Sequence, residues 1–236
     1  MKLSKIFNRQ LALPLNFRKL KNQDNFLIND SNKMAVSLID EMRNLSVFKK
    51  KYIFPILYLY GPERSGKTHL ASIFKENNNA KFINRIKEKD LLNAKKGCSY
   101  IIDNLEKNSN LDPKMLMHLI NEVYSGSGSI LLISNLPPSQ IKFDIIDLKS
   151  RIKSFINVGI DLPNDEVLYS MLIKELDDRK IILSDNLCFY IIKRIPRNYK
   201  SILEFSKQLD RISLEIKGQI KLSHIRSLID YINNKN

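Results

Sequence analysis

Cysteine, long apolar runs and acidic side chains are all scarce in this sequence of 236 residues. The two cysteines, Cys98 and Cys188, lie far apart in apolar surroundings. We therefore expect buried thiols in a reducing cytoplasm rather than a disulfide or a metal site. No apolar run reaches transmembrane length, and the apolar part of residues 1–7 is too short for a signal peptide. These absences argue against a membrane protein and predict a soluble, cytoplasmic chain.

Acidic residues are outnumbered by basic ones, with 25 Asp and Glu against 39 Lys and Arg, which gives a formal charge of +14. Such an excess suggests a nucleic-acid partner. A second interpretation stays open, because Lys, Asn and Ile prevail everywhere and a genome rich in A and T would produce that composition without selection. The basic residues are spread along the chain, so we expect weak or indirect contact with DNA rather than tight binding.

What the chain does contain is a phosphate-binding pattern, G-x-x-x-x-G-K-[ST], at residues 61–68. It follows an apolar run and precedes a helical stretch, which is the strand–loop–helix context that the motif requires. Backbone N–H groups of such a loop point at phosphate oxygens, Lys67 adds a charge near the β- and γ-phosphates, and Thr68 can ligate Mg²⁺. A chance loop before a helix is the alternative. The expected nucleotide contacts here are Gly61, Pro62, Glu63, Arg64, Ser65, Gly66, Lys67, Thr68 and His69.

The order of apolar runs and helical patterns predicts three parts: a basic tail (1–17), an α/β nucleotide-binding domain (18–161) and an all-helical domain (162–236). Expected strands are 53–60, 81–83, 100–102, 130–134 and 155–160. Expected helices are 32–44, 67–77, 86–93, 113–125 and 145–152, then 165–180, 184–194, 199–216 and 222–232, with Ser184 and Ser223 as N-caps. The predicted fold class is α/β, a P-loop five-stranded parallel sheet followed by a small helical lid.

Three polar residues after buried strands complete the expected nucleotide site. Asp103 ends an apolar strand and would hold the Mg²⁺ shell, unless it only caps the following loop. Asn104 stands where ATPases of this kind usually have an acid that orients the attacking water. An amide is a poor proton acceptor, so we expect slow intrinsic hydrolysis. Asn135 follows the strand 130–134 and could reach a γ-phosphate or its attacking water, or could form a turn before Leu136.

These pieces resemble the AAA+ superfamily, and within it the DnaA family, over residues 22–232. Residues 24–32 look like the family's N-terminal box, which implies that Phe26, Leu27 and Ile28 flank adenine. Residues 147–151 look like the motif that ends in an arginine finger, so the resemblance makes Arg151 the group that stabilises charge on a neighbouring subunit's γ-phosphate. A surface arginine is the alternative.

The helical part resembles the same family around residues 197–204. Lys200 stands where the family has its second sensor arginine, and Arg197 lies one turn earlier. The resemblance implies nucleotide contacts for both, but lysine does not replace arginine at a bidentate phosphate contact. This departure leaves the lid's sensing of nucleotide open, and an exposed helix residue is the alternative for Lys200.

The tail resembles the clamp-binding peptide Q-L-x-L-P-L of the Hda family of DnaA-related regulators. An extended peptide of this kind places leucines in an apolar pocket while its glutamine makes polar anchoring bonds. The implied clamp contacts are Gln10, Leu11, Leu13, Pro14 and Leu15. The sequence ends at Asn236, soon after the lid, so we do not expect it to read an origin as DnaA does.

The resemblance therefore implies an Hda-like inhibitor of replication initiation, located at the nucleoid or replisome. Such a chain would bind ADP or ATP with Mg²⁺ at Thr68 and Asp103, dock on the sliding clamp, and offer Arg151 to ATP held by DnaA. Self-association is plausible, because AAA+ sites form between subunits. Two alternatives remain: an AAA+ helicase loader that uses its own ATP cycle, and a nucleotide-stabilised adaptor that links the clamp to another protein.

Overall fold

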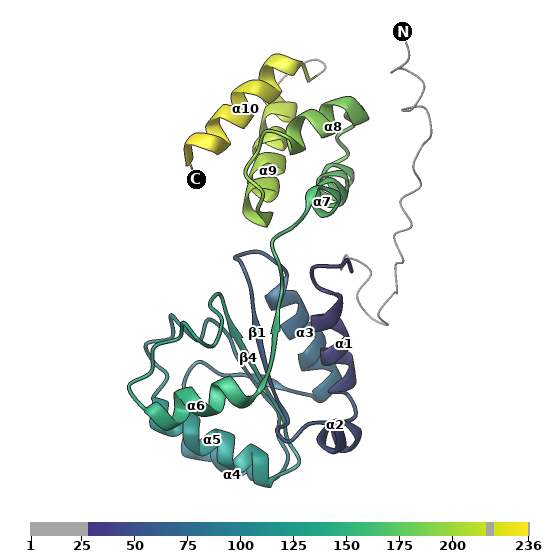
Figure 1. Ribbon diagram of the computed structural model, residues 1–236. Coiled ribbons are helices and arrows are strands. Elements are labelled where there is room, and N and C mark those ends of the chain that lie inside the picture. The colour runs from purple at the N-terminus through teal and green to yellow at the C-terminus, as the bar shows by residue number, and fades with distance from the viewer. Residues whose placement is uncertain (1–27, 216–219, 236) are drawn as a thin grey trace.

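The computed structural model describes residues 28–215 and 220–235, which form two lobes, an α/β domain and a helical lid (Figure 1). The α/β domain contains a sheet of five parallel strands in the order β2-β3-β4-β1-β5. Their bounds are β1 Ile56–Tyr60, β2 Lys81–Phe82, β3 Tyr100–Ile102, β4 Ile130–Ser134 and β5 Ile156–Gly159. The predicted α/β class with a five-stranded parallel sheet is confirmed.

Alternate residues of the central strands point to opposite faces of the sheet, as the period of two in a strand requires. Leu57 and Leu59 of β1 pack with α1 and α3 on one face, whereas Ile56 and Tyr58 pack with α4, α5 and α6 on the other. Because both faces are covered, these strands are continuous apolar runs without polar alternation. The result is a three-layer α/β/α arrangement (Figure 1).

The helices that cover the sheet are α1 Lys33–Glu41, α2 Leu45–Lys51, α3 Lys67–Asn78, α4 Glu88–Lys95, α5 Pro113–Ser125 and α6 Ile146–Ser154. The prediction of a single helix over 32–44 was wrong at its C-terminal end. The helix α1 stops at Glu41, and Asn44 is the N-cap of α2, which was not predicted. The strand expected from residue 53 begins only at Ile56. Pro55 precedes it and lacks the N–H that a central strand needs, and Ile53 is exposed.

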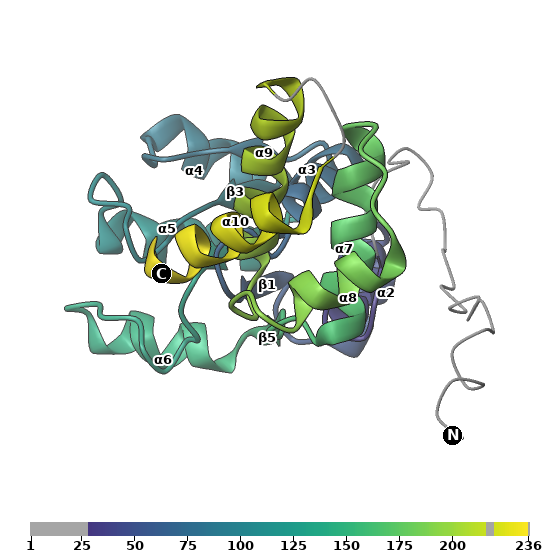
Figure 2. The same cartoon turned by 90° about the horizontal axis from the view of Figure 1, so that it is seen from above.

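The lid consists of α7 Asp165–Asp178, α8 Asp185–Ile192, α9 Tyr199–Glu215 and α10 Leu222–Lys235 around its own apolar core. Seen from above, the lid lies over one end of the sheet rather than beside it (Figure 2). Ser184 occupies the N-cap of α8 as expected, although its side chain makes no capping hydrogen bond. The prediction of Ser223 as an N-cap was wrong, because α10 already begins at Leu222.

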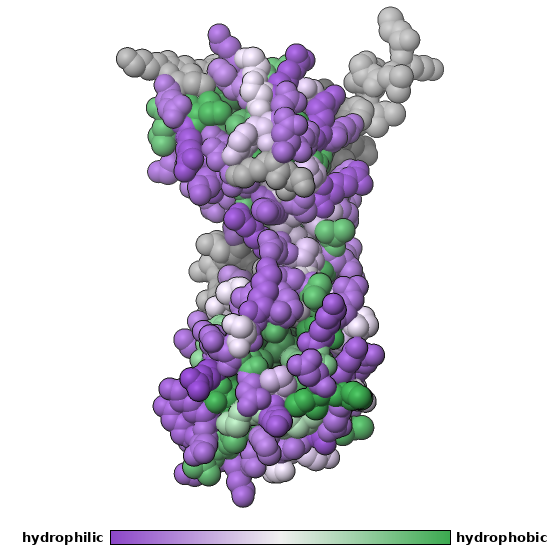
Figure 3. All heavy atoms as spheres, turned by 90° about the vertical axis from the view of Figure 1, so that its left-hand side faces the viewer, coloured by the Kyte–Doolittle hydropathy of each residue, from purple (hydrophilic) through white to green (hydrophobic). Residues whose placement is uncertain are grey.

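One stretch of chain, residues 160–164, connects β5 to α7 between the two lobes. A narrower waist separates the lobes on the face drawn in Figure 3. Within the described ranges, no helix is long and apolar enough to cross a membrane. Cys98 and Cys188 are both free; Cys188 is buried and Cys98 is half-buried.

Candidate functional site

The predicted nucleotide-site residues of the sheet come together at one edge. The strands β3, β4 and β1 are parallel neighbours, so their carboxyl ends meet. Asp103 follows β3, Asn135 follows β4, and the loop that begins at Gly61 follows β1. Ligands of open α/β sheets bind at this edge, where the chain leaves the sheet in opposite directions from adjacent strands.

The loop between β1 and α3 has the backbone that a phosphate cradle needs. Gly61 has φ +154°, and a Cβ at this position would lie 2.7 Å from the carbonyl oxygen of Ile160, so only glycine fits. Gly66 has φ +92° at the N-cap of α3, while Arg64 holds φ +63° although it has a long side chain. The loop therefore opens directly into a helix N-terminus whose first N–H groups have no helical partner.

Lys67 is buried beneath this loop, with a residue exposure of 8%. Its Nζ donates to the carbonyl oxygens of Gly61, at 2.9 Å, and Pro62, at 2.7 Å. Burial lowers the pKa of Lys67, and the nearby carboxylates of Asp103, Glu106 and Glu63 oppose that shift. The ammonium group thus lies inside the loop, where an incoming phosphate could compete with two neutral carbonyls for its protons.

Ser65 gives an independent sign that the loop is shaped for a polar ligand. The residue is 5% exposed, and its Oγ is buried without a hydrogen-bond partner among the residues that the structure describes. Buried hydroxyls are normally hydrogen-bonded, so an unpartnered one is expected where a ligand supplies the missing acceptor. Together with the exposed N–H groups and Lys67, this hydroxyl fits a phosphate group.

Thr68 and Asp103 are the pair expected to hold Mg²⁺. The Oγ1 of Thr68 lies 3.5 Å from Oδ2 of Asp103, so the two oxygens stand on the same side of the loop. Oxygen ligands of this kind suit Mg²⁺. The other carboxylate oxygen of Asp103 accepts a hydrogen bond of 2.7 Å from the backbone N–H of Asn104, which has φ +52° and an exposed side chain.

Glu106 is a site residue that the sequence reasoning missed. Its carboxylate accepts hydrogen bonds from Oγ of Ser134, at 2.8 Å, and from Nδ2 of Asn135, at 2.7 Å. It also lies close enough to Lys67 to raise the pKa of that amine. The only signal in the sequence is a third polar residue in the loop after β3, two positions beyond Asn104. The structure thus gives Asn135 a charged partner.

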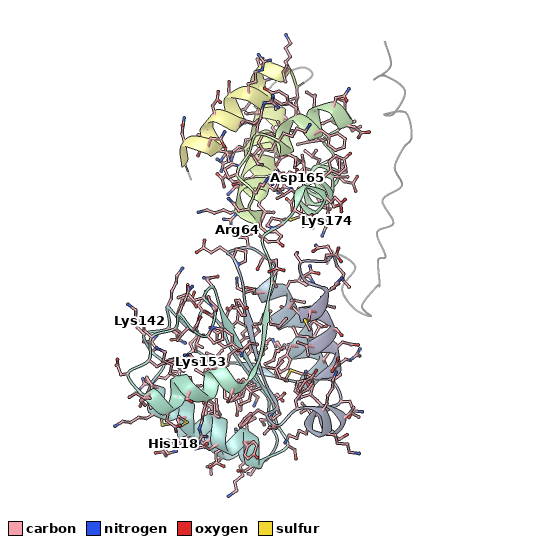
Figure 4. All side chains as sticks on the ribbon, viewed as in Figure 1. Arg64, His118, Lys142, Lys153, Asp165 and Lys174 are labelled. Atoms are coloured by element: carbon pink, nitrogen blue, oxygen red, sulfur yellow. The ribbon has the colours of Figure 1, made fainter. Side chains whose placement is uncertain are left out.

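Two lysines, Lys107 of the α/β domain and Lys200 of the lid, act on Glu63 of the phosphate loop. Glu63 forms an ion pair of 3.3 Å with Lys107, and Lys107 first and Lys200 of α9 second hold the pKa of Glu63 below its ordinary value. Figure 4 shows Arg64 at the end of the α/β domain that faces the lid, and Lys174 and Asp165 on α7 of the lid.

Two other predicted contacts have partners within the structure. Burial and then the charge of Lys174 lower the pKa of His69, while Glu76 opposes that shift. Arg197 pairs with Asp165, with its Nη2 at 3.2 Å from the carboxylate. Both residues of this exposed pair belong to the lid, so Arg197 forms its ion pair within the lid.

The predicted adenine side is only partly described. Phe26 and Leu27 lie outside the described residues, whereas Ile28 packs against the core formed by α1 and α3. The expected clamp-binding residues, Gln10, Leu11, Leu13, Pro14 and Leu15, also lie outside the described residues. Three residues after Ile28, Ser31 bonds to Tyr199 of the lid over 2.9 Å, which links the segment before α1 to α9.

Arg151, the predicted arginine finger, lies on α6 and is directed to α5 and its own helix. Its Nη1 donates to Oδ1 of Asn121, and its Nε lies 3.6 Å from Oδ2 of Asp147. The side chain remains 38% exposed. In Figure 1, α6 lies well away from the loop between β1 and α3. Arg151 is therefore not brought together with the phosphate loop of its own chain.

Comparison with curated proteins reveals similarity to DnaA. The chain is 25% identical over 243 residues to the chromosomal replication initiator protein DnaA of Borrelia turicatae, covering 90% of this chain and 49% of that protein. It is also 25% identical over 263 residues to DnaA of Borreliella afzelii, covering 96% of this chain and 53% of that protein. The chain thus spans about half the length of these relatives. No protein-family model matches it.

Comparison with solved structures gives the same fold. Domain III of the Thermotoga maritima replication initiation protein DnaA superimposes with a TM-score of 0.68 at 18% identity, over 88% of this chain and 95% of that domain. AMPPCP-bound DnaA from Aquifex aeolicus gives a TM-score of 0.65 at 16% identity, over 80% and 65% of the two chains. The chain therefore has the fold of DnaA domain III: an α/β domain with a helical lid.

Proposed function

We propose that this chain is an Hda-like regulator that binds adenine nucleotide and stimulates ATP hydrolysis by DnaA. The observation that carries the proposal is a phosphate loop complete in Lys67, Thr68 and Asp103, beside Asn104 where a water-activating acid would stand. Such a site suits nucleotide binding better than rapid turnover, because an amide cannot take the proton of the attacking water. A fold by itself does not determine function, so the proposal depends on these residues.

The bound ligand in this proposal is ADP or ATP. The buried Oγ of Ser65, which has no hydrogen-bond partner in the described part of the chain, and the N-terminus of α3 support a phosphate. The likeness to AMPPCP-bound DnaA supports an adenine nucleotide. Thr68 and Asp103 would hold Mg²⁺, which neutralises phosphate charge and orients the phosphate oxygens. Lys67 would exchange its two carbonyl acceptors for phosphate oxygens.

Arg151 would act on ATP bound by another molecule. Its position on α6 and its contacts with Asn121 and Asp147 leave the guanidinium partly exposed and separate from its own phosphate loop. An arginine supplied in trans can accelerate phosphoryl transfer by roughly 10³–10⁵-fold in related enzymes. In the complex, Arg151 would exchange its neutral acceptor Asn121 for the γ-phosphate of ATP on DnaA.

The sliding clamp is the second proposed partner. Residues 10–15, Q-L-A-L-P-L, match the peptide type that inserts leucines into an apolar pocket of the clamp. Docking there would bring the chain to replicating DNA and raise its effective concentration near DnaA. This places the proposed action at the nucleoid, and self-association through the AAA+ fold would belong to the same assembly.

The test is hydrolysis of ATP prebound to the cognate DnaA, with clamp-loaded DNA, with and without this protein. We expect stimulation that is lost in Arg151→Ala and in the double variant Gln10→Ala, Leu13→Ala. Lys153→Ala, an exposed change on the same helix as Arg151, and Asn8→Ala in the tail should retain it. Direct clamp binding should survive Arg151→Ala but not the tail variant. Full stimulation by Arg151→Ala would exclude the arginine finger.

Glu106 favours a second candidate, an ATPase or helicase loader with its own cycle. Its carboxylate lies in the same site and contacts Asn135, so an acid is present although position 104 lacks one. Single-turnover hydrolysis by the purified chain alone separates the two candidates. Brisk hydrolysis that disappears in Glu106→Gln would support the second candidate and contradict the regulator with an inert site.

A further inference from the structure

Tyr199 connects three segments that meet between the two lobes. The residue is 4% exposed at the first position of α9. Its hydroxyl lies 2.9 Å from Oγ of Ser31, which precedes α1, and donates over 3.1 Å to the carbonyl oxygen of Asp161, in the connection from β5 to the lid. The backbone N–H of Asp161 in turn donates to the carbonyl oxygen of Ser31 over 3.2 Å.

The same cluster continues toward the adenine side of the site. Asn29, next to Ile28, accepts hydrogen bonds through its Oδ1 from the backbone N–H of Ser31, at 2.9 Å, and from the hydroxyl of Ser31. Since each hydroxyl carries one proton, Ser31 donates to Asn29, and Tyr199 shares its proton between Asp161 and Ser31. The position of Tyr199 therefore depends on the conformation of residues 29–31.

Lys200 follows Tyr199 on α9 and faces a different direction. Consecutive helix residues are about 100° apart, so a buried Tyr199 leaves Lys200 on the exposed side. The start of α9 lies beside the phosphate loop, because Tyr199 bonds to Asp161, and the backbone N–H of Ile160 donates over 2.7 Å to the carbonyl oxygen of Tyr60, which precedes Gly61. There Lys107 first and Lys200 second hold the pKa of Glu63 below its ordinary value. Any shift of Tyr199 moves the start of α9, and with it the distance between Lys200 and the phosphate loop.

We infer that Tyr199 is a positioning residue. Its hydroxyl bonds to the segment 29–31 on the proposed adenine side, and this contact holds Lys200 near the phosphates of the bound nucleotide. The inference rests on the proposed nucleotide binding. The apolar interior alone would hold a phenylalanine at this position equally well, because Tyr199 packs within the core that joins α1, α3 and the lid. What the hydroxyl adds is a directional link between the adenine side and α9.

The test is a double-mutant cycle on the affinity for MgADP, measured by calorimetry on the full chain. Tyr199→Phe should weaken binding by roughly three- to tenfold, the value of one lost hydrogen bond. Lys200→Ala should also weaken it. If Tyr199 acts through Lys200, Tyr199→Phe in the Lys200→Ala background should change affinity less than twofold. Ser31→Ala should behave like Tyr199→Phe and show the same coupling to Lys200.

The matched control is Tyr190→Phe, which also removes a hydroxyl from a lid tyrosine; that ring contacts Arg194, and no hydrogen bond of its hydroxyl is found among the described residues. It should bind MgADP as wild type does. The thermal unfolding temperature without nucleotide should be slightly lower for Tyr199→Phe and Ser31→Ala, which lose hydrogen bonds, and unchanged for Tyr190→Phe and Lys200→Ala. Equal losses from Tyr199→Phe with and without Lys200 would overturn the inference and leave a merely structural role. Failure of the wild-type chain to bind MgADP would instead contradict the proposed nucleotide site.

Discussion

Glu106 brings a negative charge into a site that is also expected to hold phosphate. Two donors, Ser134 and Asn135, hold this carboxylate at the end of β4. Ser134 is 1% exposed, so its hydroxyl has little access to water if the carboxylate is removed. The carboxylate therefore stabilises the end of β4 through these two hydrogen bonds, whatever part it plays in hydrolysis.

We predict that Glu106→Ala lowers the free energy of unfolding by about 1–3 kcal/mol, because it leaves Ser134 and Asn135 without their acceptor. Glu106→Gln keeps one acceptor oxygen and should cost about half as much. Urea unfolding measures both. Glu76→Ala, an exposed glutamate of α3, is the control and should stay within about 0.5 kcal/mol of wild type. An unchanged stability of Glu106→Ala would show that the two hydrogen bonds contribute nothing.

At this scale the sequence predicts residues whose chemistry is fixed by spacing. Lys67, Thr68 and Asp103 are found together because their positions follow from a motif and from a strand that ends at the sheet's edge. Glu106 was not predicted, because its role depends on Ser134 and Asn135, which are 28 and 29 residues away along the chain. A sequence pattern read along one segment does not contain that contact.

At the scale of elements, errors concentrate at the ends of helices and strands. The runs at 100–102, 130–134 and 113–125 were predicted with the bounds that the structure has, because an apolar run or a Pro at the first helical turn marks them. The helix over residues 45–51 was not predicted, since it buries only Phe48. The available signal was Asn44, whose side chain accepts from the backbone N–H of Val47 as an N-cap.

The stability of the lid should fall at high pH, because the thiol of Cys188 on α8 is buried in the lid's core. Burial raises the pKa of the Cys188 thiol from its ordinary value of 9.0 to about 11. A raised pKa means that folding favours the neutral thiol. This contribution is fully present below pH 9 and is lost as the pH rises through 11.

We therefore predict that the melting temperature difference between wild type and Cys188→Ala becomes smaller from pH 8 to pH 10.5. At pH 8, Cys188→Ala is less stable because a buried side chain is truncated; at pH 10.5, part of that advantage of wild type has gone. Cys98→Ala, at the half-buried cysteine, serves as the control. A difference that stays constant over this range would contradict the buried, neutral thiol.

At the scale of the whole molecule, Tyr199 of the lid bonds to Ser31 and Asp161, and the chain carries a formal net charge of +14. On the face drawn in Figure 3, hydrophilic residues cover most of the lid and hydrophobic ones gather mainly on the α/β lobe. Lysines occur on both lobes, for example at the ends of α2 and α4 in the α/β domain and in α9 of the lid. Charge spread in this way attracts DNA without defining one groove or stripe for it.

Such a surface should bind duplex DNA weakly, without regard to sequence and with a strong dependence on salt. We predict a Kd of about 10⁻⁴–10⁻⁶ M at physiological salt, with a linear fall of log K against log[salt]. Fluorescence anisotropy from 50 to 200 mM KCl on two unrelated duplexes measures both. Because the charge is spread out, Lys50→Glu on α2 and Lys96→Glu after α4, both exposed positions, should weaken binding to a similar small extent. A single substitution that abolishes binding would instead reveal a dedicated DNA site and would favour the loader over the regulator.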